Sequence, residues 1–155
     1  MELNQVLQRL QFTIDKAKLL KDEQFVYCRY VTTYDVENAC GTVCCIAGHY
    51  PNWGIREFSI NYNEDFDSNY QLVYNEFENA KNGLSDFHGI SIDLINFLFY
   101  GYPIEHPLFL QFGAYYSSML QLPQVITRFE YVHKLIAEGT ILHNFSYSKH
   151  LPKWN

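Results

Sequence analysis

The sequence predicts a mainly α-helical protein, built as a compact bundle of about five short helices. At most a small β element would be added, which would make the fold α+β. Apolar side chains recur at helical spacing in separate windows, and capping residues or prolines begin these windows while glycines end them. Neither an internal repeat nor a linker divides the 155 residues, so we expect a single domain over 1–155.

The clearest window is the first, over residues 3–20. Its apolar residues share one face of a helix and are Leu3, Val6, Leu7, Leu10, Ile14 and Ala17. The stretch that follows, 25–33, is rich in β-branched and aromatic residues, which favours a short strand or an extended arm.

A shorter helix is predicted over 43–47, with Thr42 as its N-cap. Gly48 or Pro51 would end this helix, since glycine favours helix ends and proline cannot continue a helix. Residues 51–66 carry aromatic side chains without helical spacing, so we expect an irregular loop there.

Two helices are predicted in the middle of the chain. Asp67 or Ser68 can cap the first, Gly83 would end it, and its inner face would carry Tyr70, Val73, Phe77 and Ala80. Ser91 caps the second and Gly101 ends it, with an inner face of Ile92, Ile95, Leu98 and Phe99.

Proline marks the start of two later segments. Pro107 could begin a further helix, and Pro123 opens the last clear one at its first turn. Gly139 ends this last helix, whose apolar face carries Val125, Ile126, Phe129, Val132 and Ile136. His133 lies on the same face and is interpreted as a core histidine rather than a ligand. Because each apolar stripe needs a partner, we expect the first and last helices to pack together.

Composition is that of a folded protein. Hydrophobic residues make up 48% of the chain and aromatic residues 17%, which argues against disorder. No apolar run reaches the roughly 18 residues of a membrane span, and Met1–Gln5 lacks the basic start of a secretion signal. We therefore expect a cytoplasmic protein with reduced cysteines and no membrane partner.

The formal net charge of −6 is unevenly distributed. Residues 1–56 hold six acids and six bases, and residues 81–155 hold five of each. The excess therefore lies in 57–80, where no base accompanies Glu57, Glu64, Asp65, Asp67, Glu76 and Glu78. Direct nucleic-acid binding through phosphates is disfavoured, because it needs a basic patch. This acidic segment is either a solvated face or a surface for a basic partner.

Three of the four cysteines stand within six residues, in the segment C-G-T-V-C-C-I-A-G-H at 40–49. Cys40, Cys45 and His49 have a spacing that a structural zinc site can use, although no second cysteine pair completes it. Cys40 also follows the pattern of a thiol at a helix start, which resembles papain-like cysteine hydrolases. Such a nucleophile would need a remote histidine, and His143 is the candidate.

A structural interpretation needs no chemistry and is the one favoured here. Cysteine packs as a small hydrophobe and is among the most buried residue types. Small residues at Cys44, Cys45, Ala47 and Gly48 would let a short helix approach its neighbours closely. We therefore predict a buried structural helix start, with neither a metal nor another cofactor.

The segment resembles the motif C-G-T-x-x-C-[IL]-A-G-[HW] of a family of small proteins from bacteriophages and bacteria. Every fixed position of the motif matches within 40–49. Downstream, Ala80, Gly83, Leu84, Leu98 and Phe99 match looser features, so the resemblance covers roughly 3–138. Cys44 and a long aromatic stretch over 102–121 depart from the pattern. The resemblance implies a phage or bacterial origin and a cytosolic setting, and it brings no catalytic residues.

Together these observations predict a small phage-type accessory protein that binds a host protein and modulates its activity. The alternatives are the cysteine hydrolase and the zinc-stabilised module. The acidic segment suits a basic, nucleic-acid-handling partner, and the aromatic stretch offers a second surface. The binding residues predicted from these two surfaces are Glu64, Asp65, Asp67, Tyr100, Tyr102, Phe109, Tyr115 and Tyr116.

Overall fold

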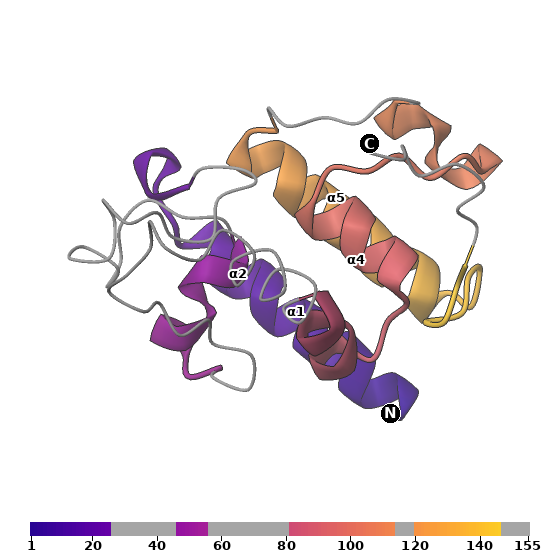
Figure 1. Cartoon of the computed structure of the whole chain (residues 1–155), viewed down its shortest axis with the longest axis horizontal. Coiled ribbons are helices and arrows are strands. Elements are labelled where there is room, and N and C mark those ends of the chain that lie inside the picture. The colour runs from indigo at the N-terminus through magenta and orange to yellow at the C-terminus, as the bar shows by residue number, and fades with distance from the viewer. Residues whose placement is uncertain (26–45, 56–80, 114–119, 147–155) are drawn as a thin grey trace, which may run out of the picture.

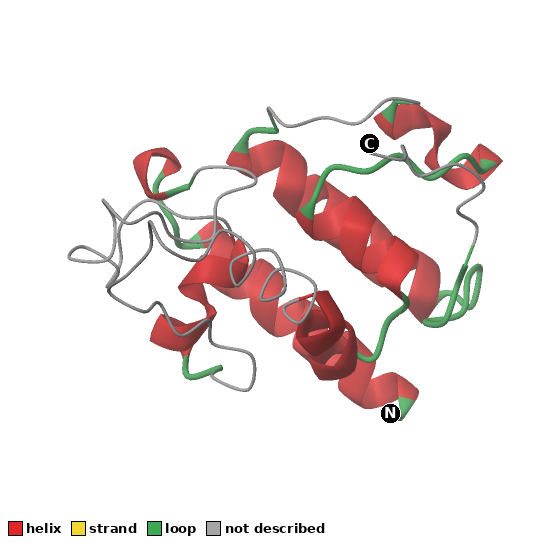
Figure 2. Ribbon diagram, viewed as in Figure 1, coloured by secondary structure: helices red, strands yellow, loops and turns green. Residues whose placement is uncertain are grey.

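The computed structural model describes residues 1–25, 46–55, 81–113 and 120–146, and this part of the chain is helical (Figure 1). Its α-helices are α1 (Leu3–Lys18), α2 (Ile46–His49), α4 (Ile92–Phe99), α5 (Leu122–Ala137) and the helical residues 81–88. Its 3-10 helices are η1 (Asp22–Gln24), η3 (Tyr50–Trp53) and η5 (Pro107–Phe112). Figure 2 shows no strand in the described part, so the predicted mainly helical bundle is confirmed.

The first and last helices pack together, as their stripes predicted. α1 contacts α5 and buries Leu10 and Ile14. α5 buries the expected Phe129, Val132 and Ile136, and Pro123 lies in its first turn. Three residues of the predicted stripes differ. Leu7 and Ile126 are only partly buried, and Leu3 in the first turn of α1 is 47% exposed.

α4 lies alongside α5 and is buried on more than one face (Figure 1). Its predicted N-cap is confirmed, since the Ser91 hydroxyl accepts a hydrogen bond from Leu94 N–H at 3.3 Å. Every residue from 94 to 99 is buried. Ile92 was expected to face inward, but it is 38% exposed. It is the first residue of α4.

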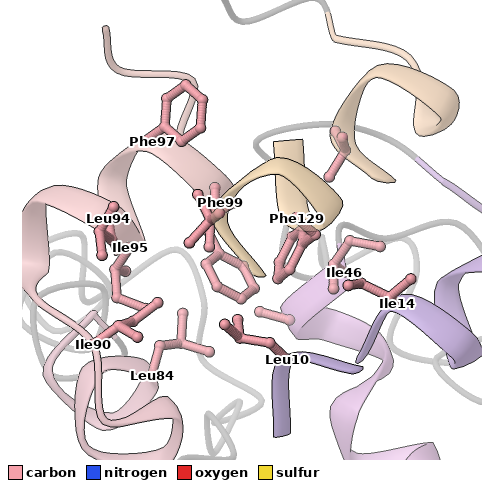
Figure 3. Packing of buried hydrophobic residues seen from close by; sticks show 14 of the residues in the cluster. Leu10, Ile14, Ile46, Leu84, Ile90, Leu94, Ile95, Phe97, Phe99 and Phe129 are labelled. Carbon is pink, nitrogen blue, oxygen red and sulfur yellow. The ribbon is translucent and has the colours of Figure 1, made fainter. Parts of the chain in front are cut away.

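The buried apolar residues of the described part of the chain form one cluster. Figure 3 shows Leu10 of α1, Leu84 of the helical residues 81–88 and Phe129 of α5 converging on one another. Ile46 of α2 and Phe99 of α4 join the same cluster. Helices far apart in sequence therefore share one core. No described helix has the length and apolar character needed to cross a membrane.

The helix over residues 81–88 ends at a different glycine from the one predicted. Gly83 lies inside it, whereas Gly89 has a φ of +65° and ends it. A left-handed φ suits glycine because other residues meet a steric penalty there. The periodicity alone could not show which of the two glycines adopts this conformation.

Replacing Gly89 with alanine is expected to lower the free energy of unfolding by about 1–2 kcal/mol because of the left-handed φ, and by about 1 kcal/mol more because of crowding. An added Cβ would lie 2.7 Å from Met1 Sδ and 3.1 Å from Val6 Cγ2. Gly139→Ala is the matched control, because its φ is +72° but nothing lies within 4 Å. Urea denaturation measures both losses, and equal losses would show that the close approach at Gly89 is unimportant.

Shorter segments also differ from the predictions. Pro107 begins a helix as expected, but it is the 3-10 helix η5 rather than an α-helix. Tyr50–Trp53 forms η3, so residues 51–53 are helical although an irregular loop was expected over 51–66. Gly48 lies within α2, which ends one residue later. Residues 26–45 and 56–80, with the predicted cap Thr42 and the helix expected after Asp67, lie outside the described residues.

Candidate functional site

The described end of the cysteine-containing motif is largely buried. Ile46, Ala47 and His49 of α2 are at most 4% exposed. The His49 Nε2–H group donates a hydrogen bond to the Gln24 carbonyl oxygen at 2.8 Å, and the ring stacks on Trp53 with centroids 5.7 Å apart. The histidine of the motif thus joins α2 to the segment after α1.

Behind this histidine lies a buried chain of hydrogen bonds. The Tyr50 hydroxyl lies 2.8 Å from Thr13 Oγ1 and 2.8 Å from His88 Nε2. All three residues are 0% exposed. They come from α1, η3 and the helix over residues 81–88, so this polar chain connects three separate segments. Buried polar groups are tolerated only when they are hydrogen-bonded, so these hydrogen bonds favour one specific arrangement of the three segments.

His88 is held in its neutral form. Burial, together with the smaller effect of the positive charge of Arg9, lowers the pKa of His88 from 6.5 to about 3. Arg9 donates to the Phe87 carbonyl oxygen, and its guanidinium lies 4.5 Å from the Phe87 ring centroid. Within the described residues, His88 Nδ1 has no hydrogen-bond partner. Because the His88 imidazole is fully buried, the hydrogen-bonded side chains of Thr13, Tyr50 and His88 can respond to pH but cannot exchange protons directly with an external substrate.

The aromatic stretch turns out to supply core as well as surface. Phe109 is fully buried and packs edge-on against Phe97 with centroids 5.1 Å apart, so its predicted place on a binding surface is wrong. Tyr100 is 9% exposed, and Tyr102 is partly exposed. Of the predicted aromatic binding residues within the described part, Tyr102 is therefore the most accessible.

A buried arginine holds this stretch against α5. Arg128 is 3% exposed and donates to the carbonyl oxygens of Phe97 at 3.0 Å and Phe112 at 3.3 Å. Its guanidinium also lies 4.5 Å from the Phe97 ring centroid and 5.6 Å from that of Phe112. Arg128 was not predicted as a core residue, although its place three residues after Val125 and four before Val132 puts it on the apolar stripe.

A second cation lies over the predicted tyrosines. The Lys81 ammonium is 4.6 Å from the Tyr100 ring centroid and 5.4 Å from that of Tyr102. Both distances fall within the range of cation–π attraction. The structure therefore brings two of the predicted binding residues together and places a positive charge on them.

The predicted histidines have different environments. His143 lies in a turn, and its carbonyl oxygen accepts a hydrogen bond from Ser91 N–H at 2.9 Å. His133 is only partly buried, so its interpretation as a core histidine is wrong. The fully buried histidines among the described residues are His49 and His88.

Several predicted site residues lie outside the described residues. They are Cys40, Cys45, Glu64, Asp65, Asp67, Tyr115 and Tyr116. Among the residues that are described, no group of three or more His, Cys, Asp and Glu side chains could hold a metal ion. The hydrolase built on Cys40 and His143 and the zinc module built on Cys40, Cys45 and His49 thus stay predictions.

The chain matches no family model, no curated protein and no solved structure. The resemblance to the phage and bacterial motif family stays a prediction as well.

Proposed function

We propose that this chain is a small accessory protein, of the kind that bacteriophages encode, which binds a basic host protein and modulates its activity. The observation that carries this proposal is the concentration of the whole net charge of −6 in residues 57–80. A cluster of one sign attracts partners of the opposite sign and speeds their encounter. A nucleic-acid-handling protein is the favoured partner, because such proteins present basic surfaces.

The described residues on either side of the acidic segment are attached to the core. On one side, Ile55 is buried and its N–H group donates to the Tyr50 carbonyl oxygen at 2.9 Å. On the other side, the helix over 81–88 buries Leu84 and contributes His88. Because Tyr50 and His88 share a hydrogen bond, both flanks of the segment are attached to the same part of the core.

Reversing Glu64, Asp65 and Asp67 to lysine tests the proposal. The partner is first captured from a bacterial lysate on the immobilised protein and identified. Its association rate is then measured by surface plasmon resonance at low and high salt. We expect the triple variant to associate about tenfold more slowly at low salt, with little difference at high salt, because electrostatic steering is screened by ions.

The matched control reverses three acids from described, exposed positions, namely Glu23, Glu105 and Glu138. Each variant gains six charge units, so both change the formal net charge from −6 to 0. If the association rate decreases by the same factor in both variants, overall charge rather than the acidic segment attracts the partner. An unchanged rate and salt dependence in the first variant would exclude the segment as the binding surface.

A further inference from the structure

The end of α4 fixes the two tyrosines beneath Lys81. Gly101 adopts a φ of +71°, which turns the chain directly after Tyr100. The backbone N–H groups of Tyr100 and Tyr102 both donate to the Asn96 carbonyl oxygen, at 3.0 and 3.2 Å. Because both residues are held by the same acceptor, their positions are set before any ligand arrives, and less ordering is needed on binding.

The chemistry of this tyrosine pair suits a cation. The face of an aromatic ring carries negative charge density, and it attracts ammonium and guanidinium groups within about 6 Å of its centroid. Lys81 shows that the pair accepts such a group, since one ammonium is close to both rings. Lys81 and Tyr102 are partly exposed, whereas Tyr100 is 9% exposed, so a cation from solvent would reach the same place only when Lys81 moves away.

We infer that Tyr100 and Tyr102 form a receptor for a basic side chain of the partner, and that Lys81 occupies this receptor until the partner displaces it. The inference rests on the proposed function, which requires a basic partner. It adds a specific contact to the long-range attraction of the acidic segment. The acids would speed the encounter, whereas the tyrosine pair would slow dissociation.

An internal competitor has a measurable consequence. While Lys81 lies on the rings, an external cation binds only to the fraction of molecules in which the rings are open. Removing the Lys81 ammonium should therefore raise the apparent affinity for an added cation. A cation–π contact at a partly exposed site corresponds to a factor of about two to five in affinity.

The probe is tetramethylammonium chloride, because a quaternary ammonium ion binds to aromatic faces without donating hydrogen bonds. Its methyl proton resonances, which ring currents move, are followed by NMR while the protein is titrated. We expect Lys81→Gln to bind the probe about two to five times more tightly than the unaltered protein. Tyr102→Leu should lose most of the shift, and the double variant should resemble Tyr102→Leu.

Lys134→Gln is the matched control, since it removes the same charge from an exposed position on α5. It should bind the probe like the unaltered protein, and circular dichroism checks that all variants are folded. Equal probe binding by the unaltered protein, Lys81→Gln and Tyr102→Leu would overturn the receptor. An equal gain in Lys81→Gln and Lys134→Gln would also overturn it, because net charge would then explain the gain.

The receptor and the proposed function can fail separately. If the acidic reversal slows association of the partner while substitution of Lys81 and Tyr102 leaves probe binding unchanged, the proposed function stands and the receptor is wrong. If the probe responds as expected while the acidic reversal changes nothing, the receptor stands and the acidic surface is wrong. Both stand if the captured partner also dissociates faster from Tyr102→Leu than from Lys134→Gln.

Discussion

Replacing Phe129 with alanine should lower the free energy of unfolding by about 3–5 kcal/mol. The Phe129 side chain is 1% exposed and packs edge-on against Phe99, with centroids 5.2 Å apart. It comes from α5 at the centre of the shared core (Figure 3). The loss combines the missing transfer free energy with the cavity left behind, and urea denaturation followed by circular dichroism measures it.

Leu142→Ala is the control for this substitution. Leu142 is 68% exposed, so its truncation should change the free energy of unfolding by less than about 1 kcal/mol. A loss below about 1 kcal/mol for Phe129→Ala would mean that the packing of α5 on α1 and α4 does not hold the fold together.

The second large effect concerns acid. His88 has a pKa of about 3 when folded and an ordinary pKa of 6.5 when unfolded. Between these values the unfolded chain binds a proton that the folded protein does not bind, so stability falls as pH falls from about 6.5 towards 3. The contribution is complete above pH 6.5 and decreases by about 1.4 kcal/mol per pH unit within this window.

Chemical denaturation at several pH values measures this slope. His88→Gln should be less stable at neutral pH but should have a shallower slope between pH 6.5 and 4. Leu142→Ala, which removes no titratable group from an exposed position, should keep the slope of the unaltered protein. An NMR titration of the unaltered protein is a second measurement, and protonation of His88 near pH 6 in the folded state would contradict the prediction.

Local sequence signals predicted the helices that have clear caps and stripes. α1 begins at the predicted residue, and the Ser91 hydroxyl caps α4 as expected. Pro123 lies in the first turn of α5. These features depend on neighbours within one or two turns, so the sequence contains the information needed to predict them.

Features that depend on distant partners could not be predicted in the same way. Tyr50 and His88 are 38 residues apart, and only the folded core shows that they share a hydrogen bond. Arg128 would have looked misplaced on an apolar stripe, because the carbonyl groups it binds come from other segments. Periodicity identifies a buried face but does not show how a polar residue on that face is satisfied.

The candidate site was predicted only in outline. Aromatic composition identified the stretch that holds Tyr102, but it did not separate this accessible residue from the buried Phe109. Lys81 was missed because a cation–π contact between segments has no sequence spacing of its own. The acidic segment was identified from charge alone, and its residues lie outside the described part.

The pairing of α1 with α5 also has a consequence for synthesis of the protein. The ribosome completes α1 at Lys18, but α5 extends from Leu122 to Ala137. At about 5–20 residues per second, the intervening translation takes roughly 6–24 s. During that interval the nascent chain lacks the helix that covers Leu10 and Ile14. Chaperones or earlier parts of the chain must therefore cover these side chains to prevent aggregation.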